Sequence, residues 1–469
     1  MALHMRSSIL VILTAFLWIM GISCTRTGDT SYHILFKTQV LDTIPYRIPA
    51  IAPLSDGSLL ALADYRYCRG DIGWGRVDIH GRKSYDDGAT WTEEFPLLEG
   101  SGIPKAVDCG FGDAALVADR EGEEVVVITV CGETVYWHET TNRQNPNRIA
   151  ILRSLDNART WEPWKEITED IYSLFDESSH GCVQSCFVGS GKICQSRKYK
   201  YGSHYRIYAA LCARPNGNRL LYSDDFGRTW AALGGIDALP AMNGDEPKCE
   251  ELPDGSVVLS SRTRGGRIFN IFTYSDASKA EGQWGEAAFS GVDNNGCEAI
   301  DNACNGEILI VPAVRKADGE KVSIVLQSVP LGPGRTRVGV YFKEVAAGMN
   351  PQTMASGWET PYKGSDQPSS YSTMALQSVP LGPGRTRVGV YFKEVTGGMT
   401  PQAMASDWEG PYQVSDKPSA YSTMVLQDNG TIAFYYEEEN RPVEGGFDMV
   451  YKEIPLDSLT FDRYKIWKR

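Results

Sequence analysis

The chain has 469 residues, which is enough for one large domain or for two to three ordinary ones. A hydrophobic content of 42% and an aromatic content of 10% are those of a globular protein, and 47 glycines and 24 prolines indicate many turns. The formal net charge of −13 argues against nucleic acid as a partner, because phosphate binding needs a basic face.

The N-terminal segment has the pattern of an export signal. Arg6 supplies a positive flank, residues 9–20 are an apolar run, and small residues lead to Cys24. The run is too short for a typical membrane-spanning helix. We expect residues 1–24 to be a signal peptide that ends at a lipidated Cys24, and cleavage nearby by ordinary signal peptidase is the alternative. The mature protein would lie in the periplasm, in the outer membrane or at the cell surface, with this anchor as its membrane contact.

Ten cysteines follow Cys24, and an even number in an exported protein permits disulfides. No pair has C-x-x-C spacing together with partner histidines. We therefore expect neither a zinc site nor any other metal or cofactor.

Short β-branched or alternating runs predict antiparallel strands along the rest of the chain. Turns such as Asp-Gly and Asn-Gly precede several of them. The sequence therefore predicts an all-β protein, with residues 30–469 as one domain. The clearest runs are residues 58–63, 124–130, 256–260, 307–311 and 431–436.

A short motif, S-x-D-x-G-x-T-W, occurs at residues 84–91, 154–161 and 223–230, with a degenerate fourth copy at 275–284. These copies look like Asp-boxes, in which Asp and Ser/Thr side chains tie a hairpin turn. Ala158 replaces the glycine of the second copy, and because glycine permits a positive φ, we expect that turn to be looser. Repeated four-stranded units predict a β-propeller, and the motifs themselves are structural.

A second repeat is nearly identical rather than diverged. Residues 326–345 recur without change at 376–395, an offset of 50 residues (376 − 326), and similarity continues through tandem segments 326–377 and 376–427. This pattern indicates a recent duplication of one blade's length. The extra unit must either loop out of the propeller or add a blade.

Several polar residues lie in short motifs whose spacing is compared with a known family below. Arg47 lies in Tyr-Arg-Ile-Pro, and Asp71 follows Arg66 by five residues (71 − 66) in a glycine-rich loop. Arg262 follows Glu246 by sixteen residues (262 − 246). Taken alone, Asp71 would be a turn residue. Asp113 is a further site candidate. Glu250 and Glu251 lie close to Glu246 and are the alternatives to it as the site glutamate.

Two further motifs occur once in each duplicated copy. Arg-Val-Gly-Val-Tyr-Phe begins at Arg337 and at Arg387, and Tyr-Ser-Thr-Met begins at Tyr371 and at Tyr421. Of the two tyrosines, Tyr421 is the preferred site candidate, because the chain continues from it directly into the last predicted hairpin. Proximity favours Arg387, although Arg337 continues from the strand before it.

Together with the Asp-boxes, these motifs resemble the bacterial exo-α-sialidases, a family of retaining glycoside hydrolases with a tyrosine nucleophile. The resemblance covers the chain from about residue 32 to its end and implies a six-bladed propeller. It also implies the following roles: Tyr421 as nucleophile, Glu246 as its base, Asp71 as general acid and base, Arg47, Arg262 and Arg387 as carboxylate ligands, and Arg66 and Asp113 as sugar contacts.

The chemistry explains these residue types. Sialic acid carries a carboxylate on its anomeric carbon, which guanidinium groups bind through directional, charge-assisted hydrogen bonds. A carboxylate nucleophile would meet that charge at close range, whereas the neutral phenol of sialidases avoids the repulsion. With a pKa near 10, tyrosine needs a neighbouring base.

Several alternatives remain open. The duplication could have disrupted the site and left a non-catalytic propeller that binds sialylated glycans. A related ulosonic acid as substrate and intramolecular trans-sialidase activity are also compatible with these residues, and linkage preference is not encoded in them. We expect sialylated glycans as the partners of a monomeric protein.

Overall fold

The computed structural model describes residues 32–38, 44–294, 296–297, 304–330, 338–339, 389–395, 398–406, 409–415, 417, 419–439 and 447–467. Several sequence predictions therefore lie outside the described residues. They are the signal segment with Cys24, both candidates for the third arginine (Arg337 and Arg387), and Tyr371.

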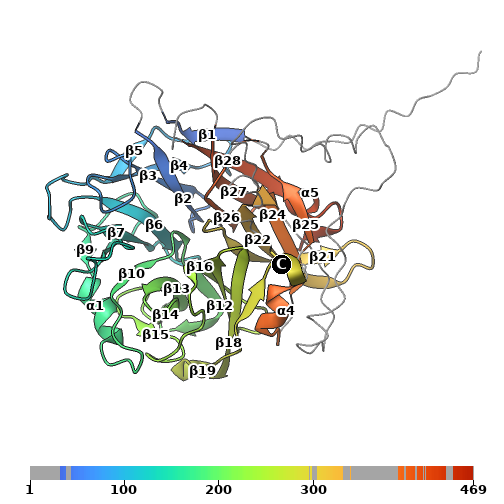
Figure 1. Ribbon diagram of the computed structural model, residues 1–469. Coiled ribbons are helices and arrows are strands. Elements are labelled where there is room, and N and C mark those ends of the chain that lie inside the picture. The colour runs from blue at the N-terminus through green and yellow to red at the C-terminus, as the bar shows by residue number, and fades with distance from the viewer. Residues whose placement is uncertain are drawn as a thin grey trace, which may run out of the picture. The chain divides into compact units, whose positions relative to one another are not determined.

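Six sheets, in which every strand pairing but one is antiparallel among the described residues, follow one another around a common centre and form a six-bladed β-propeller (Figure 1). The predicted all-β fold is confirmed, and each of the five clearest predicted runs lies in or at the start of a strand. The first three blades consist of β2 (Tyr46–Pro53), β3 (Leu59–Tyr65), β4 (Asp78–Ser84) and β5 (Phe95–Leu98); β6 (Phe111–Ala118), β7 (Val125–Cys131), β8 (Arg148–Ser154), β9 (Lys165–Glu166) and β11 (Gly191–Lys192); and β10 (Ser185–Val188), β12 (Cys194–Tyr201), β13 (His204–Arg214), β14 (Arg219–Ser223) and β15 (Ala231–Ala232).

The last three blades complete the ring. They consist of β16 (Asp245–Glu251), β17 (Val257–Thr263), β18 (Gly266–Asp276), β19 (Glu281–Trp284) and β20 (Ala288–Ser290); β21 (Ile308–Arg315), β22 (Lys321–Pro330), β23 (Val338–Gly339), β24 (Gly389–Val395), β25 (Glu409–Gln413) and β29 (Tyr464–Ile466); and β1 (Tyr32–Phe36), β26 (Ser422–Leu426), β27 (Thr431–Glu438) and β28 (Asp448–Pro455). The short helices are α1 (Thr168–Tyr172), α4 (Pro401–Ala405) and α5 (Leu456–Leu459).

The ring closes with strands from both ends of the described chain. β1, from the N-terminal part, pairs antiparallel with β28, from the C-terminal part. Radial closure leaves only short, protected strand edges. The last blade therefore depends on residues that are more than 400 positions apart (Tyr32 pairs with Lys452).

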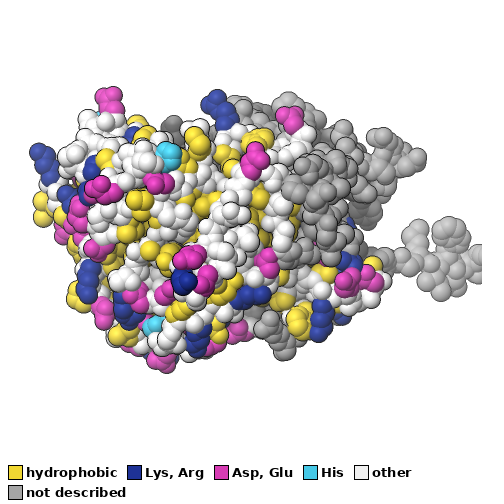
Figure 2. Space-filling view, turned by 90° about the horizontal axis from the view of Figure 1, so that it is seen from below, with side chains coloured by type: hydrophobic (Ala, Val, Ile, Leu, Met, Phe, Trp, Pro, Cys, Tyr) yellow, Lys and Arg dark blue, Asp and Glu magenta, His cyan; other side chains and the backbone are white. Residues whose placement is uncertain are grey.

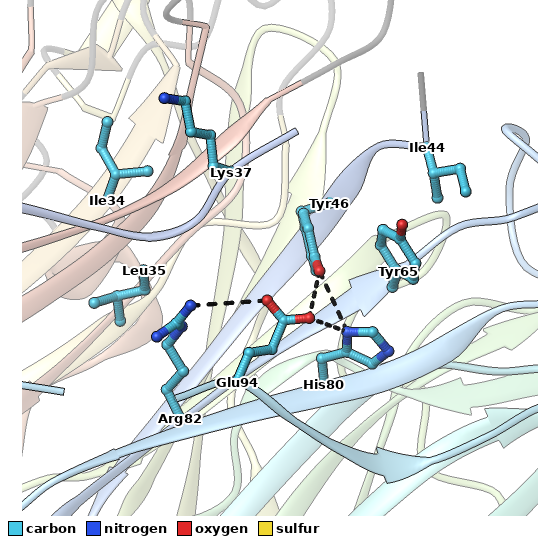
Figure 3. A pocket seen from close by; sticks show the side chains of 9 residues that line it. All are labelled: Ile34, Leu35, Lys37, Ile44, Tyr46, Tyr65, His80, Arg82 and Glu94. Carbon is cyan, nitrogen blue, oxygen red and sulfur yellow. Dashed lines mark hydrogen bonds and ion pairs between the residues drawn. The ribbon is translucent and has the colours of Figure 1, made fainter. Parts of the chain in front are cut away.

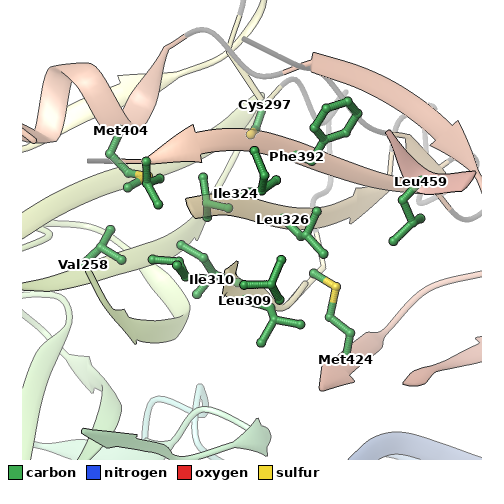
Figure 4. Packing of buried hydrophobic residues seen from close by; sticks show 14 of the residues in the cluster. Val258, Cys297, Leu309, Ile310, Ile324, Leu326, Phe392, Met404, Met424 and Leu459 are labelled. Carbon is green, nitrogen blue, oxygen red and sulfur yellow. The ribbon is translucent and has the colours of Figure 1, made fainter. Parts of the chain in front are cut away.

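The fifth blade combines strands from both duplicated copies. β22 contains the start of the first copy, and it pairs with β24, which belongs to the second copy. Phe392 of β24 lies opposite Leu326 of β22, and both side chains are buried in one apolar cluster (Figure 4). The described residues form six blades, with no seventh among them.

The Asp-box turns form as the motif predicts. In the first copy, Asp86 accepts hydrogen bonds from the backbone and the hydroxyl of Thr90 at 2.8 and 2.6 Å. The expectation of a looser second turn is wrong. Ala158 adopts a left-handed φ of 58° and its N–H still bonds Ser154 at 2.9 Å, so the side-chain bonds hold the turn without glycine.

Within the described part of the chain, no helix is long and apolar enough to cross a membrane, and no cluster of three metal-binding side chains occurs. In the described part of the chain, none of the ten cysteines after Cys24 forms a disulfide. On the face seen in Figure 2, acidic and basic side chains of the described residues are interspersed.

Candidate active site

Three inner strands each carry an irregularity at a predicted site residue. The register shifts between Arg47 and Ala50 in β2, between Gly112 and Ala115 in β6, and between Asp245 and Pro247 in β16. Such β-bulges bend a strand and re-aim its side chains. Figure 1 shows these strands around the centre of the ring. The bulges therefore bring side chains from three blades to the same region.

Two of the three bulges have a visible cause in the sequence. Pro49 and Pro247 follow the bulged residues Ile48 and Glu246, and proline inside a sheet is confined to edges and bulges because it lacks an N–H. Ile48 has a φ of 57°, which is strained for a β-branched residue and typical of functional sites.

A carboxylate accepts the backbone N–H at each bulge. Ile48 donates to Glu437 at 2.9 Å, and Asp113, whose φ is 55°, donates to Asp64 at 3.0 Å. Glu246 donates to Asp245 at 2.9 Å. These bonds stabilise backbone conformations that the strand ladder cannot satisfy.

The predicted nucleophile and its base are in contact. The hydroxyl of Tyr421 donates to Oε1 of Glu246 at 2.7 Å, and Nη1 of Arg262 donates to Oε2 at 2.6 Å. The tyrosine is only 7% exposed. Glu246 and Tyr421 raise the pKa of Arg262, although burial opposes its charge. A carboxylate within hydrogen-bond distance of a phenol is the arrangement in which a neighbouring base can activate a tyrosine.

Glu250 and Glu251, the alternatives to Glu246, bind other residues. Glu250 pairs with Lys192 at 2.5 Å, and Glu251 accepts the backbone N–H of Arg197 at 2.6 Å. Both are buried. The structure therefore places Glu246, rather than either neighbour, against Tyr421.

Arg47 lies beside the nucleophile. Its guanidinium carbon is 5.4 Å from the ring centre of Tyr421, and its Nε donates to Glu437 at 2.6 Å. Glu437 also accepts the backbone N–H of Tyr421 at 3.2 Å. Within the part of the chain that the structure describes, Glu437 is the one hydrogen-bond acceptor of the Arg47 side chain, and it binds Nε rather than the terminal amino groups.

The predicted acid lies on the loop between β3 and β4. Asp71 is the most accessible of the site carboxylates, with 51% of its side chain exposed, and it accepts a hydrogen bond from Nη1 of Arg66 at 2.9 Å. Arg66 is almost fully buried. Its other N–H groups donate to Asp64, Asp113 and the Gly70 carbonyl. In this arrangement Arg66 holds carboxylates rather than presenting a donor to a sugar.

The acid side of the site carries excess negative charge. Burial and the carboxylate of Asp64 raise the pKa of Asp113 well above its ordinary value, and Asp71 and Glu246 add to this effect. Burial also raises the pKa of Asp64 to about 6, against the lowering effect of Arg66. The cluster therefore retains a proton at pH values where isolated aspartates have lost theirs.

Sequence reasoning missed the roles of Asp64 and Glu437. Each is fully buried, and each lies in a strand next to apolar residues, at the end of Leu-Leu-Ala-Leu-Ala-Asp and after Phe-Tyr-Tyr. A carboxylate in an otherwise apolar strand was the available signal, because buried charges are almost always paired. Their partners could not be read from the sequence.

A separate polar cavity of about 400 Å³ lies between the first blade and β1 (Figure 3). Glu94 accepts from the hydroxyl of Tyr46 at 2.6 Å and lies 2.5 Å from Nδ1 of His80. Tyr46 precedes Arg47, and neighbouring side chains of a strand point to opposite faces. The aromatic residue of the Tyr-Arg-Ile-Pro motif therefore faces this cavity and not the site.

Comparison with known proteins gives a consistent result. No family model matches the chain. A sialidase of Micromonospora viridifaciens is 33% identical over 229 residues, which are 46% of this chain and 32% of that protein. A sialidase of Paraclostridium sordellii is 26% identical over 225 residues, which are 47% of this chain and 53% of that protein. The matched part of the chain thus spans about half or less of either relative.

Solved structures show the same fold. The structure of Trypanosoma rangeli sialidase in complex with sialic acid is similar with a TM-score of 0.58 and 15% identity, covering 93% of this chain and 60% of that one. At this identity the likeness establishes the propeller architecture. The chain is similar to sialidases in both sequence and fold.

Proposed function

We propose that this protein is an exo-α-sialidase that removes terminal sialic acid from glycans with retention of configuration. The observation that carries the proposal is the 2.7 Å hydrogen bond between Tyr421 and Glu246, with Arg47 and Arg262 beside it. Sequence similarity to two sialidases supports the same reaction.

The first step forms a covalent intermediate. The phenolic oxygen of Tyr421 attacks the anomeric carbon while Glu246 takes the phenolic proton. The bond between that carbon and the glycosidic oxygen breaks, and Asp71 gives its proton to the leaving oxygen. Arg47 and Arg262 hold the substrate carboxylate through charge-assisted hydrogen bonds.

The second step releases sialic acid. Water attacks the anomeric carbon, Asp71 takes a proton from that water, and the bond to Tyr421 breaks. Glu246 then returns its proton to the phenolic oxygen. Two displacements at one carbon retain the configuration. The half-exposed position of Asp71 suits a group that exchanges protons with the leaving group and then with water.

The test is to incubate the purified protein with 3′-sialyllactose and follow the products by proton NMR. The α-anomer of sialic acid should appear first and then mutarotate. First appearance of the β-anomer would contradict retention. Saturable binding of sialyllactose without turnover would favour the non-catalytic glycan-binding propeller, and a 2,7-anhydro product would show intramolecular transfer in place of hydrolysis.

A further inference from the structure

Two exposed tryptophans lie together on the loops next to the predicted acid. Trp74 and Trp137 expose 52% and 57% of their surface, and their ring centres are 6.3 Å apart with a tilt of 53°. His138 places a third ring 6.2 Å from each. We call these three residues the aromatic platform. Grouped apolar side chains on the surface mark binding sites.

The platform is tied to Asp71 through the backbone. The N–H of Trp74 donates to the carbonyl of Asp71 at 3.3 Å, which closes a turn between them. Gly73 in that turn has a φ of 95°, and a Cβ there would lie 2.7 Å from backbone atoms of Thr134 and Val135. The acid loop therefore packs directly against the loop that carries Trp137.

Buried side chains hold both loops in place. Ile72 is buried with Phe187 in a small apolar cluster, and Tyr136 packs edge-on against the same phenylalanine with ring centres 4.7 Å apart. The loop that carries Trp137 is held further by Arg214, which donates to the His138 carbonyl at 3.2 Å. Each tryptophan is thus exposed on a loop whose neighbouring side chains are buried, so its exposure does not come from an unattached loop.

We propose that Trp74 and Trp137 form the subsite for the sugar on the leaving side of the scissile bond. This inference rests on the proposed sialidase function. Asp71 must reach the glycosidic oxygen, so the group beyond that oxygen lies next to the loop of Asp71. The ring faces of indoles suit a neutral hexopyranose with an apolar C–H face, such as a β-galactoside, because they offer a large, rigid apolar surface.

The test compares two substrates that differ only in the leaving group. In 3′-sialyllactose the leaving group is a disaccharide, whereas in α-sialyl fluoride it is one atom that cannot reach the platform. For Trp74→Ala and Trp137→Ala, kcat/KM on sialyllactose should fall about tenfold or more, the worth of one aromatic contact. On sialyl fluoride it should stay within about twofold of wild type. Trp74→Phe should recover most of the loss.

Tyr85→Ala is the matched control, because Tyr85 is a 64% exposed aromatic residue on the first Asp-box turn. This substitution should leave kcat/KM unchanged on both substrates. Equal losses on both substrates for the tryptophan variants, or no loss on either, would overturn the platform as a leaving-group subsite. Failure of the proposed function looks different, since the wild-type protein would then turn over neither substrate.

Discussion

The two sides of the site differ in burial and in charge balance. The nucleophile side consists of Tyr421, Glu246 and Arg262, where the guanidinium pairs with Glu246 at 2.6 Å and with Asp245 at 3.5 Å and the tyrosine is 7% exposed. On the acid side, Asp71 exposes 51% of its side chain. One buried guanidinium there meets three carboxylates, those of Asp64, Asp71 and Asp113.

This difference follows from what each side must do in the proposed reaction. A nucleophile forms and breaks a bond at one place, so it gains from a position fixed by inner strands. An acid that serves the leaving group and then water needs access to solvent. The nucleophile side is therefore buried and positioned by inner strands, and the acid side is a loop held by a buried cluster.

The largest expected effect is on the nucleophile side. Tyr421→Phe should lower kcat on any sialoside by about 10³-fold or more, because no covalent intermediate can form. Circular dichroism should show an unchanged fold. Tyr371→Phe is the matched control, since it changes the same motif in the other copy, and it should keep full activity. An inactive Tyr371→Phe would assign the nucleophile to the first copy.

The effect of substituting the predicted acid should depend on the leaving group of the substrate. Asp71→Asn should lower kcat/KM, which reports the step in which the leaving group departs, by about 10²- to 10³-fold on sialyllactose, because the departing alkoxide then lacks a proton donor. With a nitrophenyl sialoside, whose leaving group departs without protonation, the loss should be clearly smaller. Steady-state kinetics on both substrates check this. A loss of the same size on both would make Asp71 a structural residue.

Removal of one duplicated copy should sharpen the assignment on the nucleophile side. Deletion of residues 327–376 restores the repeated segment once and keeps Arg387 and Tyr421. It shortens the connection between β22 and β24 from 58 residues (389 − 330 − 1) to 8 (58 − 50). A shorter connection loses less conformational entropy when its ends are brought together, so the deletion should raise the free energy of unfolding by about 1–2 kcal/mol.

The deletion variant should keep activity within about twofold of wild type by steady-state kinetics, and urea unfolding measures the stability change. Tyr421→Phe in the deletion background provides the inactive control. Loss of activity or of the fold in the deletion variant alone would show that the first copy supplies part of the site.

The smallest expected effect is a pH dependence on the acid side. The pKa of Asp64 is raised from 3.8 to about 6, so between these values the folded state binds more protons than the unfolded chain. The free energy of unfolding therefore falls as the pH rises through this window. The pKa of Asp113 is also raised, well above its ordinary value, by burial and by Asp64, so Asp113→Asn removes that group's own contribution and should reduce the fall by about 1 kcal/mol. Urea unfolding at pH 4.5 and 7 tests this, and an equal fall in both proteins would contradict it.

Local patterns predicted much of the fold. Strand runs such as residues 124–130 and the three Asp-box turns depend on neighbours within a few positions, and the structure contains them all. The prediction for Ala158 failed because four side-chain and backbone bonds hold its turn and outweigh the strain of a left-handed residue.

The candidate site could be predicted only in part. Arg47, Asp71, Glu246, Arg262 and Tyr421 were predicted from the resemblance of their motifs to those of sialidases. Asp64 and Glu437 were missed because the bulge residues that they bind, Asp113 and Ile48, are 49 and 389 positions away in the chain. The partnership of Trp74 with Trp137 likewise joins loops of two different blades.

By itself, the sequence determined the strands, the tied turns, the repeated blades and the residue types of a sialidase-like site, since each of these follows from side chains close together in the chain. Only the tertiary structure decided which residues meet. Closure of the ring sets Tyr421 of the sixth blade against Glu246 of the fourth, and bulges at Ile48, Asp113 and Glu246 turn their strands toward the centre. Contacts between distant segments depend on how blades pack, which no local pattern encodes.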